Sequence, residues 1–232
     1  MMRKSIISFT VLLIGLCLFF LANCSGEKQK TEEAGSISGK TAITPMNHID
    51  LWNGEDFNGW KLFVPDSAFD VSQVWSVQDG NLYCSGIPNG YIRTVQDYTN
   101  YKLFVEWRWP EEPGNSGVLL HMSEPDKVWP KSIEAQLQSG NAGDIWLIEG
   151  TEINEHTDKT QRRIEKRAES SENTPGEWNK YEITCKGDVI ELKVNGVLQN
   201  VGTGASVQSG KICLQSEGKP IEFRAIYMEP VE

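Results

Sequence analysis

The segment YEITCKGDVIELKVNGVLQNV, residues 181–201, constrains the fold most, because two turn signals divide it into three short alternating runs. Gly187-Asp188 and Asn195-Gly196 are typical of two-residue β-hairpin turns, which need residues that tolerate positive φ. The segment therefore predicts a three-stranded antiparallel meander.

The same pattern extends along most of the chain. Asp79-Gly80 separates two strand-like runs, VWSVQ and NLYCS, and further runs follow at residues 91–95 and 101–109 and near the C-terminus. We count ten or more short strands and no convincing helix. The charged segment 158–169, with Ile164 and Ala168 at helical spacing, favours a solvated loop or a short helix. Many short strands without alternating helices predict an all-β fold, an antiparallel sandwich or barrel.

The N-terminus has the parts of an export signal. Arg3 and Lys4 precede an apolar run, and residues 1–23 are therefore predicted to be a signal peptide. Leu21-Ala22-Asn23-Cys24 resembles the bacterial lipoprotein box, which predicts lipidation of Cys24. An uncleaved membrane anchor and a signal peptide cut elsewhere are the alternatives. Residues 24–45 carry few large apolar side chains and are expected to be a flexible tether, and residues 46–232 the folded domain. We therefore expect an exported protein, lipid-anchored on the periplasmic or cell-surface side.

The net charge of the chain limits the kinds of partner that it can bind. The net charge of −10 argues against binding to nucleic acid, and it leaves the lipid anchor as the expected membrane contact. Oligomeric state is not indicated.

Cys84, Cys185 and Cys213 lie outside the leader, and this odd number favours buried thiols over a disulfide framework. A Cys185–Cys213 bridge is possible if their strands are neighbours. No Cys or His stands at zinc-ligand spacing, so no cofactor is predicted, and a divalent metal is left open.

Polar side chains are concentrated between Phe104 and Gln138. In a period-2 pattern, Glu106 and Arg108 share one face of the first predicted strand, and Glu134 and Gln136 share one face of the last. His121 falls on the corresponding face of the strand between them. If these three strands belong to one sheet, the five side chains line a common surface.

Several motifs together resemble the 3-keto-disaccharide hydrolase domain family, over about Ile49 to Pro230. They are LWNGEDFNGW, WSVQDGNLYC, YKLFVEWRW, GNSGVLLH, IEAQL, GDIWLI, PGEWNKYEITCKGDVIELKVNGVLQN and GKICLQSEGKPIEFRAI. The resemblance implies a concanavalin A-like jelly-roll sandwich of two antiparallel sheets, with a ligand groove on the concave sheet. It also implies cleavage of glycosidic bonds in 3-keto sugars by elimination and hydration. The chain departs from the family pattern at Ser139, where many members have an acidic residue, and at His121, where others have Arg.

Such chemistry needs a base near the acidified C2 proton and a donor for the developing enolate oxygen. Glu134 is our first candidate for the base, because its apolar neighbours in the sequence predict burial and a raised pKa. The alternative is a structural ion pair with Arg108 or Lys131. His121 is a candidate proton shuttle or metal ligand. Glu106 is the candidate partner of Glu134 in a classical glycosidase pair.

The candidate substrate-binding residues are amides, guanidinium groups and one indole. Asn115 lies in the PGNSG turn, which the resemblance places beside the groove, and Trp146 could stack on a sugar ring. The remaining candidates are Arg108, Gln136, Gln215 and Arg224. Three functions follow: cleavage of 3-keto-glycosides, a classical glycoside hydrolase with a Glu pair, or a non-catalytic carbohydrate-binding module.

Overall fold

The predicted meander is present in the computed structural model, which describes residues 41–232. It consists of β11 (Asn179–Lys186), β12 (Val189–Val194) and β13 (Val197–Gly202). Asn195 and Gly196 have φ values of 49° and 80° in the turn between β12 and β13, as a tight hairpin requires. The predicted signal peptide, the lipidation site Cys24 and most of the expected tether lie outside the described residues.

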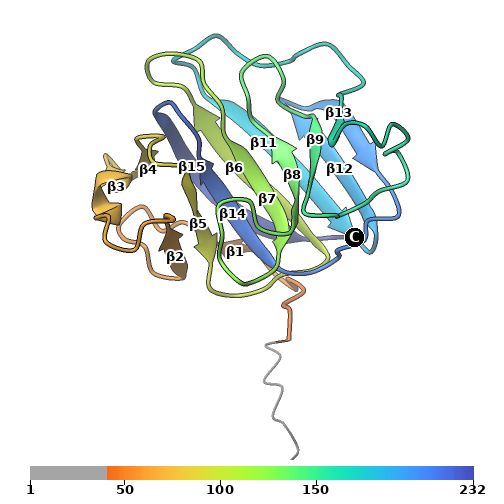
Figure 1. Cartoon of the computed structure of the whole chain (residues 1–232), viewed down its shortest axis with the longest axis horizontal. Coiled ribbons are helices and arrows are strands. Elements are labelled where there is room, and N and C mark those ends of the chain that lie inside the picture. The colour runs from red at the N-terminus through yellow and green to blue at the C-terminus, as the bar shows by residue number, and fades with distance from the viewer. Residues whose placement is uncertain (1–40) are drawn as a thin grey trace, which may run out of the picture. The chain divides into compact units, whose positions relative to one another are not determined.

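Two antiparallel sheets make up the fold (Figure 1). The first contains, in spatial order, β13, β12, β11, β6 (Tyr101–Arg108), β15 (Ile221–Pro230), β4 (Asn81–Cys84) and β3 (Trp75–Gln78), with β1 (Ile49–Asp50) also paired to β15. The second contains β10 (Arg163–Ile164), β9 (Ile145–Ile148), β8 (Ser132–Gln136), β7 (Gly117–Met122), β14 (Lys211–Ser216), β5 (Gly90–Thr94) and β2 (Trp60–Phe63). The described part contains one short 3-10 turn, Val71–Gln73, and no α-helix.

The core fills the space between the two sheets. Alternate residues of β6, such as Leu103, Val105 and Trp107, are fully buried there against Val118 and Ile133 of the second sheet. The all-β, jelly-roll sandwich predicted from the sequence is therefore confirmed. The opposite face of the second sheet carries its own apolar cluster of Phe63, Tyr91, Leu119, Met122, Ile148 and Cys213.

One prediction about the strands is wrong. β6 does not lie beside β7 and β8, because it pairs with β11 and β15 in the first sheet. Glu106 and Arg108 therefore lie in a different sheet from Glu134. Alternation along a strand predicts which residues share a face, but the partner of a strand depends on pairings far away in the sequence.

His121 also departs from the expected face. Its φ of 57° is left-handed, and the pairing of β7 with β14 shifts register between Lys211 and Cys213 opposite it. The irregularity reverses the alternation, so Met122 joins the outer cluster and the His121 ring packs against buried Tyr101, with ring centroids 5.6 Å apart. His121 is 1% exposed, and one ring nitrogen lies 3.1 Å from the Val207 carbonyl oxygen.

The cysteines outside the leader and the segment directly before β1 are both part of the folded domain. Cys84, Cys185 and Cys213 are free and buried, as favoured, and the possible Cys185–Cys213 bridge is absent: its two strands, β11 and β14, are not neighbours in a sheet. The end of the expected tether is already part of the fold, since the Ile43 N–H donates to the Asp97 carbonyl (2.8 Å) and its carbonyl accepts from Thr99 (3.0 Å). Among residues 41–232, no helix is long and apolar enough to cross a membrane.

Candidate functional site

A cavity of about 230 Å³ lies over the outer face of the second sheet. Four of the residues that line it were predicted from the sequence: Asn115, Glu134, Gln136 and Trp146. Four others were not: Trp129, Ile148, Arg162 and Glu217.

Strand β8 forms the middle of this site, because its side chains alternate between the core and the cavity. Glu134 is paired with Leu119 of β7 and Trp146 of β9, and all three side chains therefore share one face. Gln136 lies opposite Gly117, and Ser132 lies opposite Ile148. The site thus has a polar end at Gln136 and an apolar end at Ile148, with Glu134 between them.

Glu134 is the most perturbed carboxyl group in the cavity. It is 5% exposed, and the alternative ion pair with Arg108 does not form, because Arg108 donates to Glu222 instead. Burial, together with the negative charge of Glu217, raises the pKa of Glu134 to about 8, although the positive charge of Arg162 opposes the shift. A carboxyl group with this pKa can take up or release a proton near neutral pH.

Glu217 brings a second carboxyl group to the polar end. Burial raises the pKa of Glu217, and the Asn115 side chain partly offsets this. The backbones of Asn115 and Glu217 form an isolated β-bridge, which holds the loop before β7 against the chain that follows β14. The Asn115 side-chain oxygen is buried without a hydrogen-bond partner in the structure, so a ligand donor could bind it.

The Gln136 amide has a fixed orientation. Its oxygen accepts from the backbone N–H groups of Leu137 and Gln138, both at 2.9 Å. The amide nitrogen is left to donate toward the cavity that Gln136 lines. Gln136 therefore provides an oriented hydrogen-bond donor close to Glu134.

Gly117 provides the space in which Glu134 and Gln215 meet. A Cβ atom at this position would lie 2.3 Å from a side-chain oxygen of each residue. Those two oxygens are therefore no more than twice that distance apart. Gln215 is 1% exposed, and neither polar atom of its amide has a hydrogen-bond partner in the structure. Gln215 thus lies beside the Glu134 carboxyl group, below the surface of the cavity.

Two tryptophans and one arginine form the other walls. Trp129 is 43% exposed and belongs to the loop Ser123–Lys131, whose ends are joined by a backbone hydrogen bond of 3.0 Å. The Arg162 guanidinium lies 5.9 Å from the centre of the Trp146 ring. Arg162 precedes β10, which pairs with β9, in the segment that was expected to be a solvated loop or short helix. Because Arg162 is one of many charged residues in this segment, its charge does not mark it as a site residue in the sequence.

Residues 47–229 match the 3-keto-alpha-glucoside-1,2-lyase-like domain. The chain belongs to this family. A search of curated protein sequences found no match to the chain. Among residues 41–232 of this lyase-like domain, no three His, Cys, Asp or Glu side chains are grouped so that they could hold a metal ion.

Solved structures share the fold of the lyase-like domain. A candidate glycosyl hydrolase from Parabacteroides distasonis is 23% identical, with a TM-score of 0.61 over 80% of this chain and 94% of that one. A carbohydrate-binding module from Bacillus subtilis is 10% identical, with a TM-score of 0.54 over 74% and 95%. The Bacillus licheniformis β-glucanase is 11% identical, with a TM-score of 0.52 over 78% and 96%. At these identities the likeness shows the fold alone.

Three predicted site residues of the lyase-like domain lie in the first sheet instead. Arg224 donates to Glu106 at 2.7 Å, and Arg108 donates to Glu222 at 2.5 Å, as cross-strand ion pairs between β6 and β15. Both guanidinium groups lie over the Trp178 ring, at 4.7 Å for Arg108 and 4.0 Å for Arg224. This corrects the placement of Glu106 and Arg108 beside Glu134, because their sheet does not contain β8, and Arg224, a candidate for sugar contact, lies in the same sheet as these two.

Proposed function

We propose that the chain cleaves 3-keto-glycosides, with Glu134 removing the proton at C2. The observation that carries the proposal is a buried carboxyl group of raised pKa beside a cation, in a cavity where the Gln136 amide is an oriented donor. The family description, which concerns a 1,2-lyase of 3-keto-α-glucosides, supports the same chemistry.

The residues around the cavity divide the work of an elimination. Glu134 takes the C2 proton, and the electron pair of that bond forms an enolate whose oxygen is the former C3 ketone. Arg162 and the Gln136 amide nitrogen stabilise this oxygen. As the enolate reforms the ketone, the bond between C1 and the glycosidic oxygen breaks, and the protonated Glu134 carboxyl group gives its proton to the leaving oxygen. Addition of water across C1 and C2 then gives the free 3-keto sugar.

The direct test is turnover of 3-keto-trehalose and 3-keto-glucosides beside the same sugars before oxidation. We expect cleavage of the keto substrates alone, with and without a chelator. Glu134→Gln should lower kcat by about 10² to 10⁴, the usual contribution of a general base, while substrate binding persists. Glu106→Gln is the matched control, because its carboxyl group lies in the other sheet. Equal losses in the two variants, or turnover of neither substrate, would exclude the proposal.

A classical glycoside hydrolase is the second candidate, and it needs a different carboxyl pair from the one we predicted. Glu106 and Glu134 cannot act together, because they lie in different sheets. Glu134 and Glu217 do line one cavity and could serve as acid and nucleophile or base. This candidate requires cleavage of the unoxidised sugars. A carbohydrate-binding module requires instead that both substrates bind and neither is cleaved.

We also propose that the chain is exported and lipidated at Cys24, on the basis of the leader sequence. In a bacterial host, labelled fatty acid should enter the chain, and Cys24→Ser should abolish the label. Label retained by Cys24→Ser would contradict lipidation at this residue.

A further inference from the structure

The loop Ser123–Lys131 carries Trp129 to the cavity, and a cluster of charged side chains around buried Arg93 holds this loop in place. Asp126, three residues before Trp129, accepts from Arg93 at 2.7 and 3.1 Å and from Lys61 at 2.7 Å. Its carboxyl group also accepts from the Tyr91 hydroxyl at 3.0 Å. Glu124 of the same loop accepts from Arg93 at 2.7 Å.

The cluster is built into the sheet. Arg93 and Tyr91 lie on β5 and are 3% and 0% exposed, and Lys61 lies on β2 beside Arg93. Burial disfavours the charged form of Asp126, but hydrogen bonds from Arg93, Lys61 and Tyr91 outweigh this and lower the pKa of Asp126. The Asp126 carboxylate is thus charged at neutral pH and fixed by three side chains of two strands.

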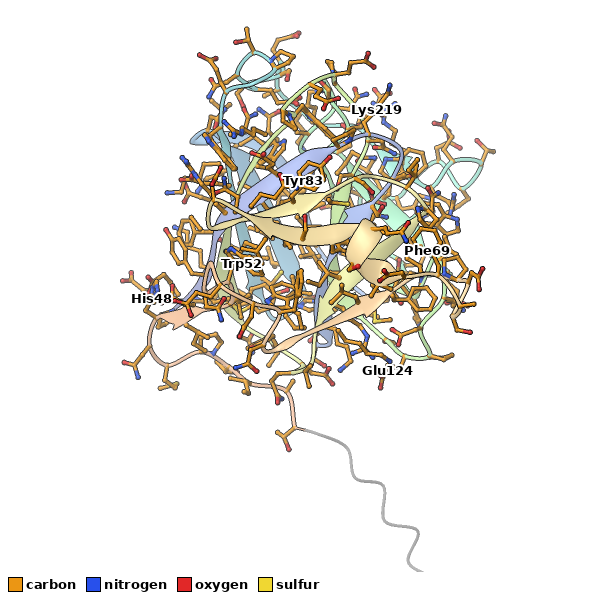
Figure 2. The ribbon with its side chains drawn as sticks, turned by 90° about the vertical axis from the view of Figure 1, so that its left-hand side faces the viewer. His48, Trp52, Phe69, Tyr83, Glu124 and Lys219 are labelled. Carbon is orange, nitrogen blue, oxygen red and sulfur yellow. The ribbon has the colours of Figure 1, made fainter. Side chains whose placement is uncertain are left out.

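The other side of the loop is fixed as well. Lys127 forms an ion pair with Glu149, in the turn that follows Ile148. Two residues after Lys127, the loop presents Trp129 to the cavity, and this side chain is 43% exposed. Figure 2 places Glu124 of this loop at the bottom of the view, and Lys219, close to Glu217 in sequence, at the top. Strand β8 begins at Ser132, directly after the loop and opposite Ile148, and ends at Gln136, so the loop and the polar end of the site lie at opposite ends of this strand.

We propose that Asp126 is a positioning residue that holds Trp129 as the apolar wall of a subsite for the leaving group of the glycoside. This inference rests on the proposed function. The polar end, with Asn115, Gln136 and Glu217, suits the hydroxyl-rich 3-keto sugar, and Glu134 lies between the two ends at the bond that breaks. The leaving group then lies against Trp129 and Ile148, which favour a group with a planar apolar face.

The first experiment measures the position of Trp129 without any substrate. In the full chain, acrylamide quenching of tryptophan fluorescence should report Trp129 most strongly, since Trp129 is exposed, Trp146 and Trp178 are half-buried, and the other five tryptophans are buried. We expect Asp126→Asn to increase quenching about twofold, and to have no effect when Trp129 is already replaced by Phe. An equal increase in both backgrounds, or none in a folded Asp126→Asn variant, would overturn the positioning role.

Two further variants distinguish a change in the position of Trp129 from a general loss of structure. Tyr91→Phe removes one hydrogen bond to Asp126 and leaves the ring in place, so it should produce a smaller change of the same kind. Asp97→Asn breaks an ion pair of 2.6 Å with buried Lys211 of the same sheet, and should leave the quenching unchanged. If Asp126→Asn does not fold, the result for Tyr91→Phe decides the question.

The second experiment measures turnover of a 3-keto aryl glucoside and of 3-keto-trehalose. Asp126→Asn and Trp129→Ala should raise KM for the aryl substrate by about 5- to 10-fold and change kcat by less than about twofold. The double variant should be no worse than Trp129→Ala alone. Additive effects would overturn the inference. If the wild-type chain cleaves neither substrate, the proposed function fails, and the quenching experiment still decides the role of Asp126.

Discussion

If Glu134 is the base, as we propose, its protonation state sets the pH range of activity. A base must be deprotonated, and burial raises the pKa of Glu134 to about 8. We therefore expect kcat/KM for a 3-keto-glucoside to rise with pH and to level off above about 8. A pH–rate profile of the wild-type chain tests this. A rate that is constant through this range, or that falls, would assign the base to another group.

The same shift links Glu134 to stability. Because its folded pKa lies above the ordinary value of 4.5, the folded protein holds this proton more tightly than the unfolded chain. The resulting stabilisation is complete below the ordinary pKa and is lost as pH rises through about 8. Glu134→Gln cannot ionise, so at pH 9 it should raise Tm by roughly 5 °C, the effect of 1–2 kcal/mol in a domain of this size. At pH 4 the two proteins should melt together. A lower Tm for the variant at pH 9 would contradict the burial of a carboxyl group there.

Gly117 is required for a steric reason rather than a conformational one. A methyl group at this position would lie 2.3 Å from oxygens of Glu134 and Gln215, so one of these side chains must move. Gly117→Ala should reduce kcat/KM by about 10²-fold or more, because catalysis is sensitive to small displacements of the reacting groups. Steady-state kinetics and circular dichroism together test whether activity is lost with the fold intact. Gly196→Ala, in a surface turn, is the control that should leave activity unchanged.

At the scale of the strand, the irregular end of β7 removes His121 from the candidate site. The side chain lies between the sheets, beside Tyr101, and has no exposed path to the cavity that Glu134 lines. We expect His121→Asn to keep kcat/KM within about threefold, since Asn tolerates positive φ. Loss of packing should cost about 1–3 kcal/mol of unfolding free energy in a denaturant titration. A hundredfold loss of activity at unchanged stability would restore a catalytic role.

Strands β6 and β15 form a face whose charges pair with each other. Glu106→Gln removes the ion pair with Arg224, whose side chains are 28% and 44% exposed. Such pairs contribute about 0–1 kcal/mol, so Tm and kcat/KM should both stay close to the wild-type values. A large loss of activity would show that this face takes part in the reaction after all.

The strands were easier to predict than their partners. The hairpin turns at Asp79-Gly80 and Asn195-Gly196 are local signals, and both form the predicted hairpins. The pairing of β6 with β15 joins residues more than a hundred positions apart, and no alternation within β6 encodes it. For this reason the sequence predicted Glu134, Gln136, Asn115 and Trp146 but missed Glu217 and Arg162, which reach the cavity from distant segments.

For the molecule as a whole, the burial of Cys84, Cys185 and Cys213 in the two sheets predicts thiols that do not react in the folded protein. Burial raises the pKa of Cys84 and of Cys185 to about 12, and Cys213 is also fully buried. Because the thiolate is the reactive form, alkylation should label these three residues only when the protein unfolds. Mass spectrometry of the labelled peptides across a denaturant titration measures each site separately. Rapid labelling of any one of them in the native protein would show that its sheet opens locally.

The pairing of Ile43 with the strand connection at Asp97–Thr99 has a mechanical consequence. Ile43 forms two backbone hydrogen bonds, of 2.8 and 3.0 Å, to Asp97 and Thr99. These bonds precede, along the chain, the first strand at Ile49. Tension arriving along the N-terminal segment is therefore transmitted first to residues 97–99, at the end of the domain where β5 leads into β6. In a pulling experiment from the N-terminus, this contact should give way before the β1–β15 pair, as a small separate event that precedes the loading of the first sheet.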